Sequence, residues 1–210
     1  MKGYTATTTR QTLLALLLTA VLCIAPAAAK PSTEIPGDSC ESIIGTTASS
    51  VDRMYYFVKQ HNENFSRDVA ETFFVVAERY GIRADVALCQ AILETGWFKF
   101  MDGTVVTPDQ YNYGGLGVTG KGAQGNSFMS MEEGVTALMQ HLYAYACCNE
   151  LPEGEVLVDK RFSLVTRGCA PTWSSLSGRW AMNDNYGRDI LRLYRRMLSF
   201  DMPAEVLTIY

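Results

Sequence analysis

The sequence has few basic residues, very few histidines and no apolar run long enough to span a membrane. Lysine and arginine number 18 against 22 acidic residues, so we do not expect a nucleic-acid-binding protein. Its two histidines, His61 and His141, lie far apart, and no cysteine spacing is that of a zinc site, so we expect no metal and no cofactor. The remaining composition, 48% hydrophobic and 19% charged, is typical of one packed domain.

The first residues have the pattern of an export signal. Lys2 and Arg10 precede an apolar run over 13–25, and small residues at 27–29 end the segment. This order predicts a signal peptide over 1–29, with an uncleaved anchor as the alternative. Residues 30–50 are rich in Pro, Ser, Thr and Gly and predict a flexible linker, which leaves 51–210 as the domain. We therefore expect a secreted or extracytoplasmic protein.

The cysteines fit an oxidising compartment only in part. Without the signal peptide five remain, which is an odd number. Cys89 lies on an apolar helical stripe, which predicts a buried thiol. Cys169 lies in a loop from which it can pair with Cys147 or Cys148, and Cys40 lies in the linker. The sequence does not choose between these pairings.

Helical periodicity covers most of the domain. It predicts helices that begin near Ser50, run over 66–81 and 84–94, begin at the Ser130 capping box, and cover 159–166 and 184–200. Between residues 97 and 130 no helical period survives, and six of the twelve residues from 114 to 125 are glycine. The sequence therefore predicts a mostly helical α+β domain with a small irregular lobe after its third helix.

The glycine run resembles two nucleotide-binding motifs without their context. Residues 115–120 match G-x-G-x-x-G, but no buried strand precedes them and no helix can start after them. Gly122 stands where a P-loop needs a hydroxyl. We expect no nucleotide, and we interpret the glycines as tight turns beside a ligand.

Glu94 is the residue with the clearest chemical signal. It follows an apolar helical stretch and precedes Trp97 and Phe98. Burial, the negative end of the helix dipole and the lack of a Lys or Arg within four residues all oppose ionisation. A carboxylic acid that keeps its proton near neutral pH can act as a general acid. The alternative is an ordinary solvated glutamate at a helix end.

Aromatic residues gather after Glu94 without the periodicity of a core. Trp97, Phe98, Phe100, Tyr111 and Tyr113 fall within 17 residues. Flat aromatic faces beside polar loops suit sugar rings, which have C–H faces and hydroxyl edges. The alternative is a small hydrophobic core under a long loop.

Four motifs in this order resemble bacterial glucosaminidases, the peptidoglycan hydrolases of glycoside hydrolase family 73. Residues 86–99 (VALCQAILETGWFK) are similar to the family's A-Q-A-I-L-E-[ST]-G-W-G-K. Residues 111–116 resemble N-N-L-F-G-I, residues 128–142 resemble F-x-x-Y-x-S-x-E-E-S, and residues 180–186 resemble Y-A-T-D-P-x-Y. The resemblance spans about residues 65–200.

The resemblance implies a lysozyme-like fold and hydrolysis of the β-1,4 bond on the reducing side of N-acetylglucosamine in peptidoglycan. It implies a protein that acts at the cell wall on a glycan strand. We expect a monomer. The acid of the family falls on Glu94. The residues that we expect to contact substrate are Trp97, Tyr111, Asn112, Tyr113, Gly115, Trp180 and Tyr186.

The chain departs from the family at three points. Phe98 replaces a glycine, which we expect to narrow the cleft edge, and Trp180 replaces a tyrosine, which removes a hydroxyl. The second carboxylate that many members carry in the lobe is missing between Asp109 and Glu132. The candidates for that group are Asp102, Asp109 and Glu132, while Glu133 has a capping role. Assistance by the substrate's N-acetyl group needs no second carboxylate.

Two other functions fit parts of this pattern. A lytic transglycosylase needs a single acid/base, so it accounts for the missing carboxylate. A catalytically weak glycan-binding protein accounts for the replacements at Phe98 and Trp180, although the retained Glu94 argues against it.

Overall fold

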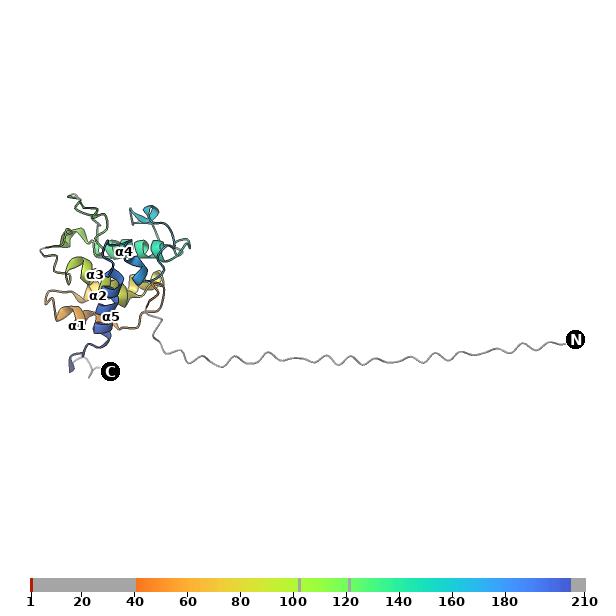
Figure 1. Cartoon of the computed structure of the whole chain (residues 1–210). Coiled ribbons are helices and arrows are strands. Elements are labelled where there is room, and N and C mark those ends of the chain that lie inside the picture. Colours follow the sequence, from red (N-terminus) through yellow and green to blue (C-terminus); the bar gives the residue numbers. More distant parts are fainter. Residues whose placement is uncertain (2–40, 102, 121, 205–210) are drawn as a thin grey trace. The chain divides into compact units, whose positions relative to one another are not determined.

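The structure is a computed structural model that describes Met1 and residues 41–101, 103–120 and 122–204. The predicted signal peptide, apart from Met1, and residues 30–40 of the predicted linker lie outside the described residues. The described part contains five α-helices and three short 3-10 helices (Figure 1). They are α1 (Val51–Lys59), α2 (Arg67–Arg79), α3 (Ala84–Thr95), η1 (Pro108–Gln110), α4 (Met131–Ala146), η2 (Phe162–Leu164), η3 (Ser174–Leu176) and α5 (Tyr186–Leu198).

Serine side chains start three of the helices. Ser50, Ser66 and Ser130 each accept a hydrogen bond from a backbone N–H in the first turn that follows. Such caps satisfy donors that have no partner inside the helix, so helix starts can be found from sequence. The five long helices are confirmed close to their predicted ends.

The helix predicted over residues 159–166 is wrong beyond a single turn, η2. Asp159 is buried, and its two carboxylate oxygens bond Arg161 N at 2.9 Å and His141 Nδ1 at 2.7 Å. The side chain of Gln140 accepts Asp159 N at 3.0 Å. Side chains therefore take the backbone donors that a helix would use, which holds the segment in a turn.

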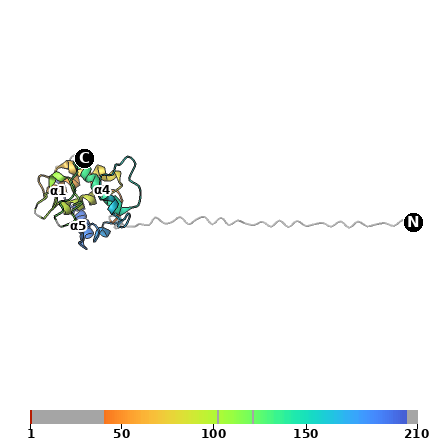
Figure 2. The same cartoon turned by 90° about the horizontal axis from the view of Figure 1, so that it is seen from above.

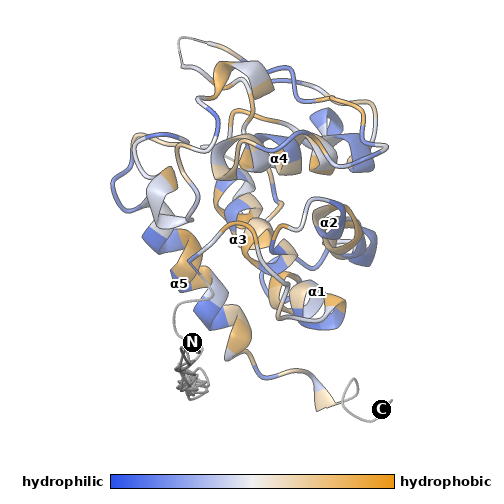
Figure 3. Ribbon diagram, turned by 90° about the vertical axis from the view of Figure 1, so that its right-hand side faces the viewer, coloured by the Kyte–Doolittle hydropathy of each residue, from blue (hydrophilic) through white to orange (hydrophobic). Residues whose placement is uncertain are grey.

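The third helix is the centre of the domain. Ten of the twelve residues of α3 are buried, and the helix packs against α1, α2 and α5. Figure 3 shows α3 between α5 on one side and α1 and α2 on the other. Helix α4 packs on α2, and Figure 2 shows it from above. A helix that is apolar all round belongs inside a domain, so its last residues are held rigidly.

The segment between α3 and α4 is irregular, as predicted. It contains turns and η1, and the residues of the chain that the structure describes contain no β-strand, only three isolated β-bridges that lie outside this segment. Glycines with positive φ, such as Gly117 and Gly125, turn the backbone here. A mostly helical domain with a small irregular lobe is therefore confirmed.

Residues 41–50 pack on the domain, contrary to the flexible linker predicted there. Ile43 is fully buried, and its N–H donates to Pro171 O at 3.0 Å. The N–H groups of Ala48 and Ser49 donate to Asp85 Oδ2, at 2.8 and 3.0 Å. These bonds join residues far apart in sequence, so composition alone does not reveal them.

The four described cysteines are free thiols. Cys89 is completely buried, which confirms that prediction. Neither pairing considered for Cys169, with Cys147 or with Cys148, is formed in this structure, and Cys40 lies outside the described residues. Among the described helices, none has both the length and the apolar character needed to cross a bilayer.

Candidate active site

Glu94 lines a cavity of about 530 Å³ between the helices and the lobe. The other walls come from residues 103–106, 114–115 and 118–120 of the lobe and from residues 180–182 before α5. A larger cavity of about 700 Å³ lies beside the connection between α1 and α2, but Glu94 is not part of its wall. The smaller cavity is the candidate active site because it contains the carboxyl group with the altered acidity.

The Glu94 carboxyl is partly exposed and strongly influenced by its neighbours. Burial raises its pKa from 4.5 to about 7, although hydrogen bonds from Tyr186 and Trp180 lower it. Tyr186 Oη donates to Glu94 Oε1. No lysine or arginine is among the groups that shift this pKa. Desolvation therefore outweighs the two donors, and a large fraction of the carboxyl keeps its proton at neutral pH.

Two glycines let the lobe approach the carboxyl. Gly115 has φ +62°, and a Cβ added there would lie 2.9 Å from Glu94 Oε2. A Cβ on Gly114 would lie 2.8 Å from Leu138 Cδ1 and 3.1 Å from Trp180 Cζ2. A side chain at either position would push the lobe away from α3 or from Trp180. Oε2 therefore lies against the lobe at Gly115, while Oε1 accepts a hydrogen bond from Tyr186.

The structure brings together four of the predicted site residues. Gly115 and Trp180 line the cavity with Glu94, and Tyr186 reaches the carboxyl from the first turn of α5. The indole of Trp180 also lowers the pKa of the carboxyl as a side-chain donor, where the family's tyrosine hydroxyl is missing. Met182, also on the wall, is 91% exposed and forms part of the rim.

The other predicted binding residues lie elsewhere. Asn112 is fully buried, and its amide bonds Leu116 and Asn126, so it holds the lobe. Trp97 packs against His61 in a tilted arrangement, with ring centroids 3.8 Å apart, and is not on the cavity wall. Tyr111 ends η1 and packs against the core. Tyr113 is also buried in the core, between aromatic rings.

The prediction that Phe98 narrows the cleft, made because it replaces a glycine, is wrong. Its backbone has φ +57°, the region that favours glycine, and the side chain is 9% exposed. The ring packs on Phe65 and Tyr113, with centroids at 4.7 and 5.8 Å, instead of facing the cavity that contains Glu94. Phe98 and Tyr113 belong to the main core of the domain, and Trp97, Phe100 and Tyr111 pack against it, so the aromatic cluster has a packing role but is not a separate small core.

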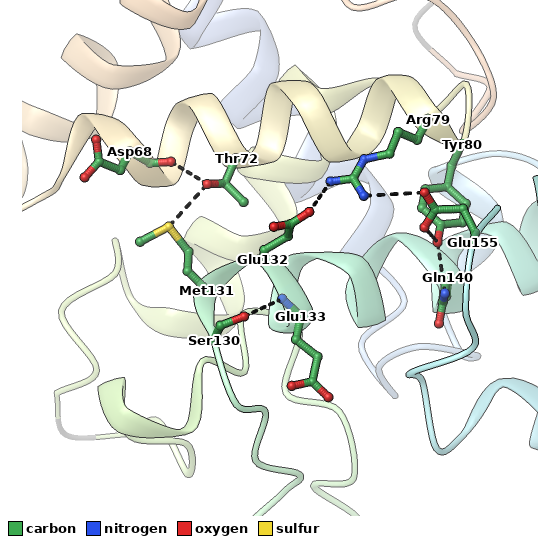
Figure 4. Close-up of polar contacts among 10 residues, drawn as sticks. All are labelled: Asp68, Thr72, Arg79, Tyr80, Ser130, Met131, Glu132, Glu133, Gln140 and Glu155. Carbon is green, nitrogen blue, oxygen red and sulfur yellow. Dashed lines mark hydrogen bonds and ion pairs between the residues drawn. The ribbon is translucent and has the colours of Figure 1, made fainter.

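Two candidates for a second carboxylate lie away from the cavity. Glu132 forms an ion pair with Arg79 Nη2 at 2.6 Å, on the side of α4 that faces α2 (Figure 4). Asp109 is exposed on η1 and does not line the cavity. Glu133 caps α4 and accepts Met129 N at 2.6 Å. Asp102 lies outside the described residues, so Glu94 is the one carboxyl among the described residues of the wall.

Gln90 is a site residue that the pattern analysis did not select. It lies one turn before Glu94 on α3, it is completely buried, and its Nε2 donates to Tyr186 Oη at 2.9 Å. The sequence carries two signals for it, since a glutamine is unusual in an apolar helix and the family's A-Q-A-I-L-E motif has a glutamine at this place. No three His, Cys, Asp or Glu side chains of the described part of the chain lie close enough together to hold a metal ion.

Comparison with known proteins identifies relatives of this chain. An uncharacterised protein of Borreliella burgdorferi is 35% identical over 140 residues, which cover 67% of each chain. Two crystal structures of S. aureus autolysin E are similar in fold. One is a complex with the muropeptide NAM-L-Ala-D-iGlu, and the other is a catalytic mutant in complex with the disaccharide NAG-NAM.

The autolysin structures support the fold assignment. Each aligns with a TM-score of 0.51 at 12% identity and covers 77% of this chain and 72% of the autolysin chain. At that identity the likeness shows the fold, and it confirms the lysozyme-like architecture expected from the motifs.

Family membership comes from the sequence itself. Residues 70–199 match the profile of the glucosaminidase family, described as mannosyl-glycoprotein endo-beta-N-acetylglucosaminidase. The matched residues include Glu94, Gly115, Trp180 and Tyr186, the four that meet at the cavity. The chain therefore belongs to the glucosaminidase family and is a glycoside hydrolase.

Proposed function

We propose that this glycoside hydrolase cleaves the β-1,4 bond on the reducing side of N-acetylglucosamine in peptidoglycan, with Glu94 as general acid. The observation that carries the proposal is the Glu94 carboxyl, which lines a cavity and has a pKa of about 7. At pH 7 about half of such groups carry a proton. A proton held there can be given to the glycosidic oxygen as the bond breaks.

The substrate class is supported by the cavity and by the fold. The wall combines a flat indole, Trp180, with backbone polar groups of the glycine-rich lobe. Such a surface suits a sugar ring, which stacks on an aromatic face and uses its hydroxyls for hydrogen bonds. The autolysin of similar fold binds a muropeptide and a NAG-NAM disaccharide in the two crystal structures. Peptidoglycan contains both kinds of unit.

Hydrolysis also needs a second group beside the acid Glu94, and two groups are candidates for it. Two-carboxylate hydrolysis needs a partner about 5–9.5 Å from the acid, depending on the stereochemical outcome. Asp102 adjoins the wall residue Gly103, so it stays a candidate. If Asp102 is not the second group, the N-acetyl group of the substrate can take the place of a carboxylate and attack the anomeric carbon.

A lytic transglycosylase is the second candidate reaction. Glu94 is the one carboxyl among the described residues of the wall, and that reaction needs one acid/base. In that reaction a hydroxyl of the sugar attacks the anomeric carbon of the same sugar, the glycosidic bond breaks, and an anhydro end is left. Both reactions would use Glu94 as the acid, and the acceptor is water in one and that hydroxyl in the other.

The site of action follows from the substrate. We propose that residues 1–29 export the chain and that it acts outside the cytoplasm, at the cell wall. Cleavage of these residues would be seen as a mature N-terminus at Lys30 when the secreted protein is sequenced.

Digestion of purified peptidoglycan tests the proposal. The mature protein is incubated with the polymer, and the new ends are identified by mass spectrometry. Reducing N-acetylglucosamine ends support hydrolysis, anhydro ends support the transglycosylase, and intact glycan that retains the protein indicates a binding role.

Three substitutions assign the groups. Glu94→Gln is expected to abolish cleavage, because the amide cannot donate a proton in this way. Glu132→Gln is the matched control, since Glu132 pairs with Arg79 away from the cavity, and it should retain activity. Asp102→Asn separates a carboxylate mechanism from N-acetyl assistance. Full activity of the Glu94→Gln protein would refute Glu94 as the acid.

A further inference from the structure

A chain of three side chains runs through the core to the carboxyl of Glu94. Gln90 and Glu94 are four residues apart on α3, so they lie on the same face of the helix. Tyr186 enters between them from α5. Gln90 Nε2 donates to Tyr186 Oη at 2.9 Å, and Tyr186 Oη donates to Glu94 Oε1. Gln90 is 0% exposed and Tyr186 is 5% exposed, so water does not compete for these bonds.

The chemistry of the groups fixes the direction of the bonds. An amide nitrogen can only donate, whereas a phenol oxygen has one proton and also accepts. When Gln90 donates to Tyr186 Oη, the phenol proton is free to point at Glu94 Oε1. Oε1 is then occupied as an acceptor. Oε2 lies beside Gly115, which lines the cavity together with Glu94, and it is the carboxyl oxygen that does not accept from Tyr186, so we assign the transferable proton to it.

We propose that Gln90 is a positioning residue that acts through Tyr186. By donating to the phenol oxygen, it directs the phenol proton to Glu94 Oε1 and so keeps the acidic proton of Glu94 on Oε2, which lies beside Gly115. This inference rests on the proposed function, because it assigns Glu94 as the acid. Gln90 touches no part of the cavity itself.

A second glutamine–tyrosine–glutamate chain in the same molecule provides a comparison. Gln140 Nε2 donates to Tyr80 Oη at 2.9 Å, and Tyr80 Oη donates to Glu155 Oε2 at 2.5 Å (Figure 4). Glu155 also pairs with Arg79 at 3.4 Å. This second chain joins the end of α2, α4 and the segment after α4, and none of its residues lines the cavity of Glu94.

The two glutamines differ in what their amide oxygens do. Gln140 Oε1 accepts the N–H groups of Val158 and Asp159, at 2.8 and 3.0 Å, and so fastens the backbone. Gln90 Oε1 is buried and has no hydrogen-bond partner. A buried acceptor without a partner costs about 1–3 kcal/mol. Unlike Gln140, Gln90 makes no side-chain hydrogen bond to the backbone that would offset this cost. The hydrogen bond that its side chain does make is the one to Tyr186.

The reverse orientation of the amide would have the opposite effect. If Gln90 Oε1 faced Tyr186, it would accept the phenol proton and take it away from Glu94. The short contact between Tyr186 and Glu94 favours donation to the carboxylate. A substitution that replaces the donor of Gln90 by an acceptor therefore tests the proposal more sharply than a deletion.

Gln90→Met removes the donor and nearly keeps the shape. We expect kcat for the release of soluble muropeptides to fall about 10- to 100-fold, since loss of positioning has effects of this size. KM should change little, because Gln90 does not contact substrate. The hydrogen bond from Tyr186 lowers the pKa of Glu94, so its weakening should move the basic limb of the pH–kcat profile to higher pH. The melting temperature should be unchanged or higher, because the unpaired amide oxygen is gone.

Gln90→Glu is the second variant, in which a carboxylate accepts the phenol proton. Its loss of kcat should exceed that of Gln90→Met and should deepen as pH rises and the new carboxylate ionises. Circular dichroism checks that both proteins fold. Gln140→Met is the matched control: it removes the other glutamine donor and should lower the melting temperature without moving the pH–kcat profile.

A double-mutant cycle with Tyr186→Phe decides whether Gln90 acts through Tyr186. In the Tyr186→Phe protein the Gln90→Met change should have no further effect on kcat. Equal loss in both backgrounds, or a pH profile that stays in place in Gln90→Met, would overturn the proposal. Glu94→Gln keeps the two claims apart: if it stays active, the proposed function fails, and if it is inactive while Gln90→Met behaves as the wild type, only the role of Gln90 fails.

Discussion

Glu94 lowers the stability of the domain at neutral and higher pH, because its pKa of about 7 in the folded chain lies above the ordinary value of 4.5. The folded chain thus binds the proton more tightly than the unfolded chain. The free energy of unfolding therefore falls as pH rises from about 4.5 to about 7. The group that we assign to catalysis is a destabilising one in its ionised form, which is typical of active sites.

The first prediction follows from this linkage. Glu94→Gln keeps the shape and the acceptor for Tyr186 but cannot ionise. At pH 4 the two proteins should melt alike, and at pH 8 the variant should be more stable by about 1–3 kcal/mol. Thermal melts at both pH values check this. A variant that is less stable at pH 8 would mean that the carboxylate is well solvated in the folded chain.

Gly115 offers a second prediction at the same scale. Gly115→Ala places a methyl group 2.9 Å from Glu94 Oε2 at a positive φ, so either the lobe or the Glu94 carboxyl must shift from its present position. We expect a loss of about 1–2 kcal/mol of stability and at least a tenfold loss of kcat. Gly81→Ala is the control, since Gly81 has φ +61° and nothing within 4 Å of the added Cβ. It should lose stability but keep its activity.

Single residues differ in how well their place can be predicted from sequence. Glu94 could be predicted because the features that oppose its ionisation, an apolar stretch and a helix end, are adjacent to it in the sequence. The role of Trp180 as a donor to Glu94 could not be predicted, because the two residues are far apart in the sequence. Trp97 and Tyr113 were expected in the site because aromatic residues near a loop suit both sugars and cores, and the pattern does not separate these roles. Only packing in three dimensions places Tyr113 in the core.

At the scale of elements, the end of α3 is held in an unusual conformation. Gly96 ends the helix with φ +58°, and Trp97, Phe98 and Phe100 continue with positive φ although they carry side chains. Each such residue costs roughly 1 kcal/mol or more. Asn62 holds this turn from the connection between α1 and α2, because its Nδ2 donates to Trp97 O at 3.0 Å and to Phe98 O at 3.1 Å.

This clamp gives the third prediction. Asn62→Ala removes both bonds and leaves two carbonyl groups without these partners, so the free energy of unfolding should fall by about 2–3 kcal/mol. Asn64→Ala, at an exposed position two residues later, should change it by less than about 0.5 kcal/mol. Urea unfolding measures both. Equal effects would show that the strained turn is stable without Asn62.

The elements also show which patterns carry information. The helices could be predicted because their apolar stripes and serine caps are local in sequence. The strained turn after α3 could not, since phenylalanine rarely adopts positive φ and Asn62 lies more than thirty residues away. The family's glycine at the position of Phe98 is the one hint that the backbone there is left-handed.

At the scale of the whole domain, residues 41–50 belong to the folded body that presents Glu94. Ala48 and Ser49 bond Asp85 at the first turn of α3, and Thr47 Oγ1 accepts Ala84 N at 2.9 Å. This segment therefore caps the start of the central helix, at whose other end Glu94 lies. Its composition resembles a linker although the side chains of Ile43 and Thr47, as well as backbone N–H groups, hold it on the domain.

Two neighbouring isoleucines test whether this segment supports the domain. Ile43 is 0% exposed and Ile44 is 39% exposed. Because Ile43 fills the core, Ile43→Ala should lower the free energy of unfolding by about 2–4 kcal/mol, whereas Ile44→Ala should lower it by less than about 1 kcal/mol. Urea unfolding of the chain from residue 41 measures both changes. If the two substitutions have the same small effect, residues 41–50 are the free arm that their composition predicts, and the start of α3 is held by the helices alone.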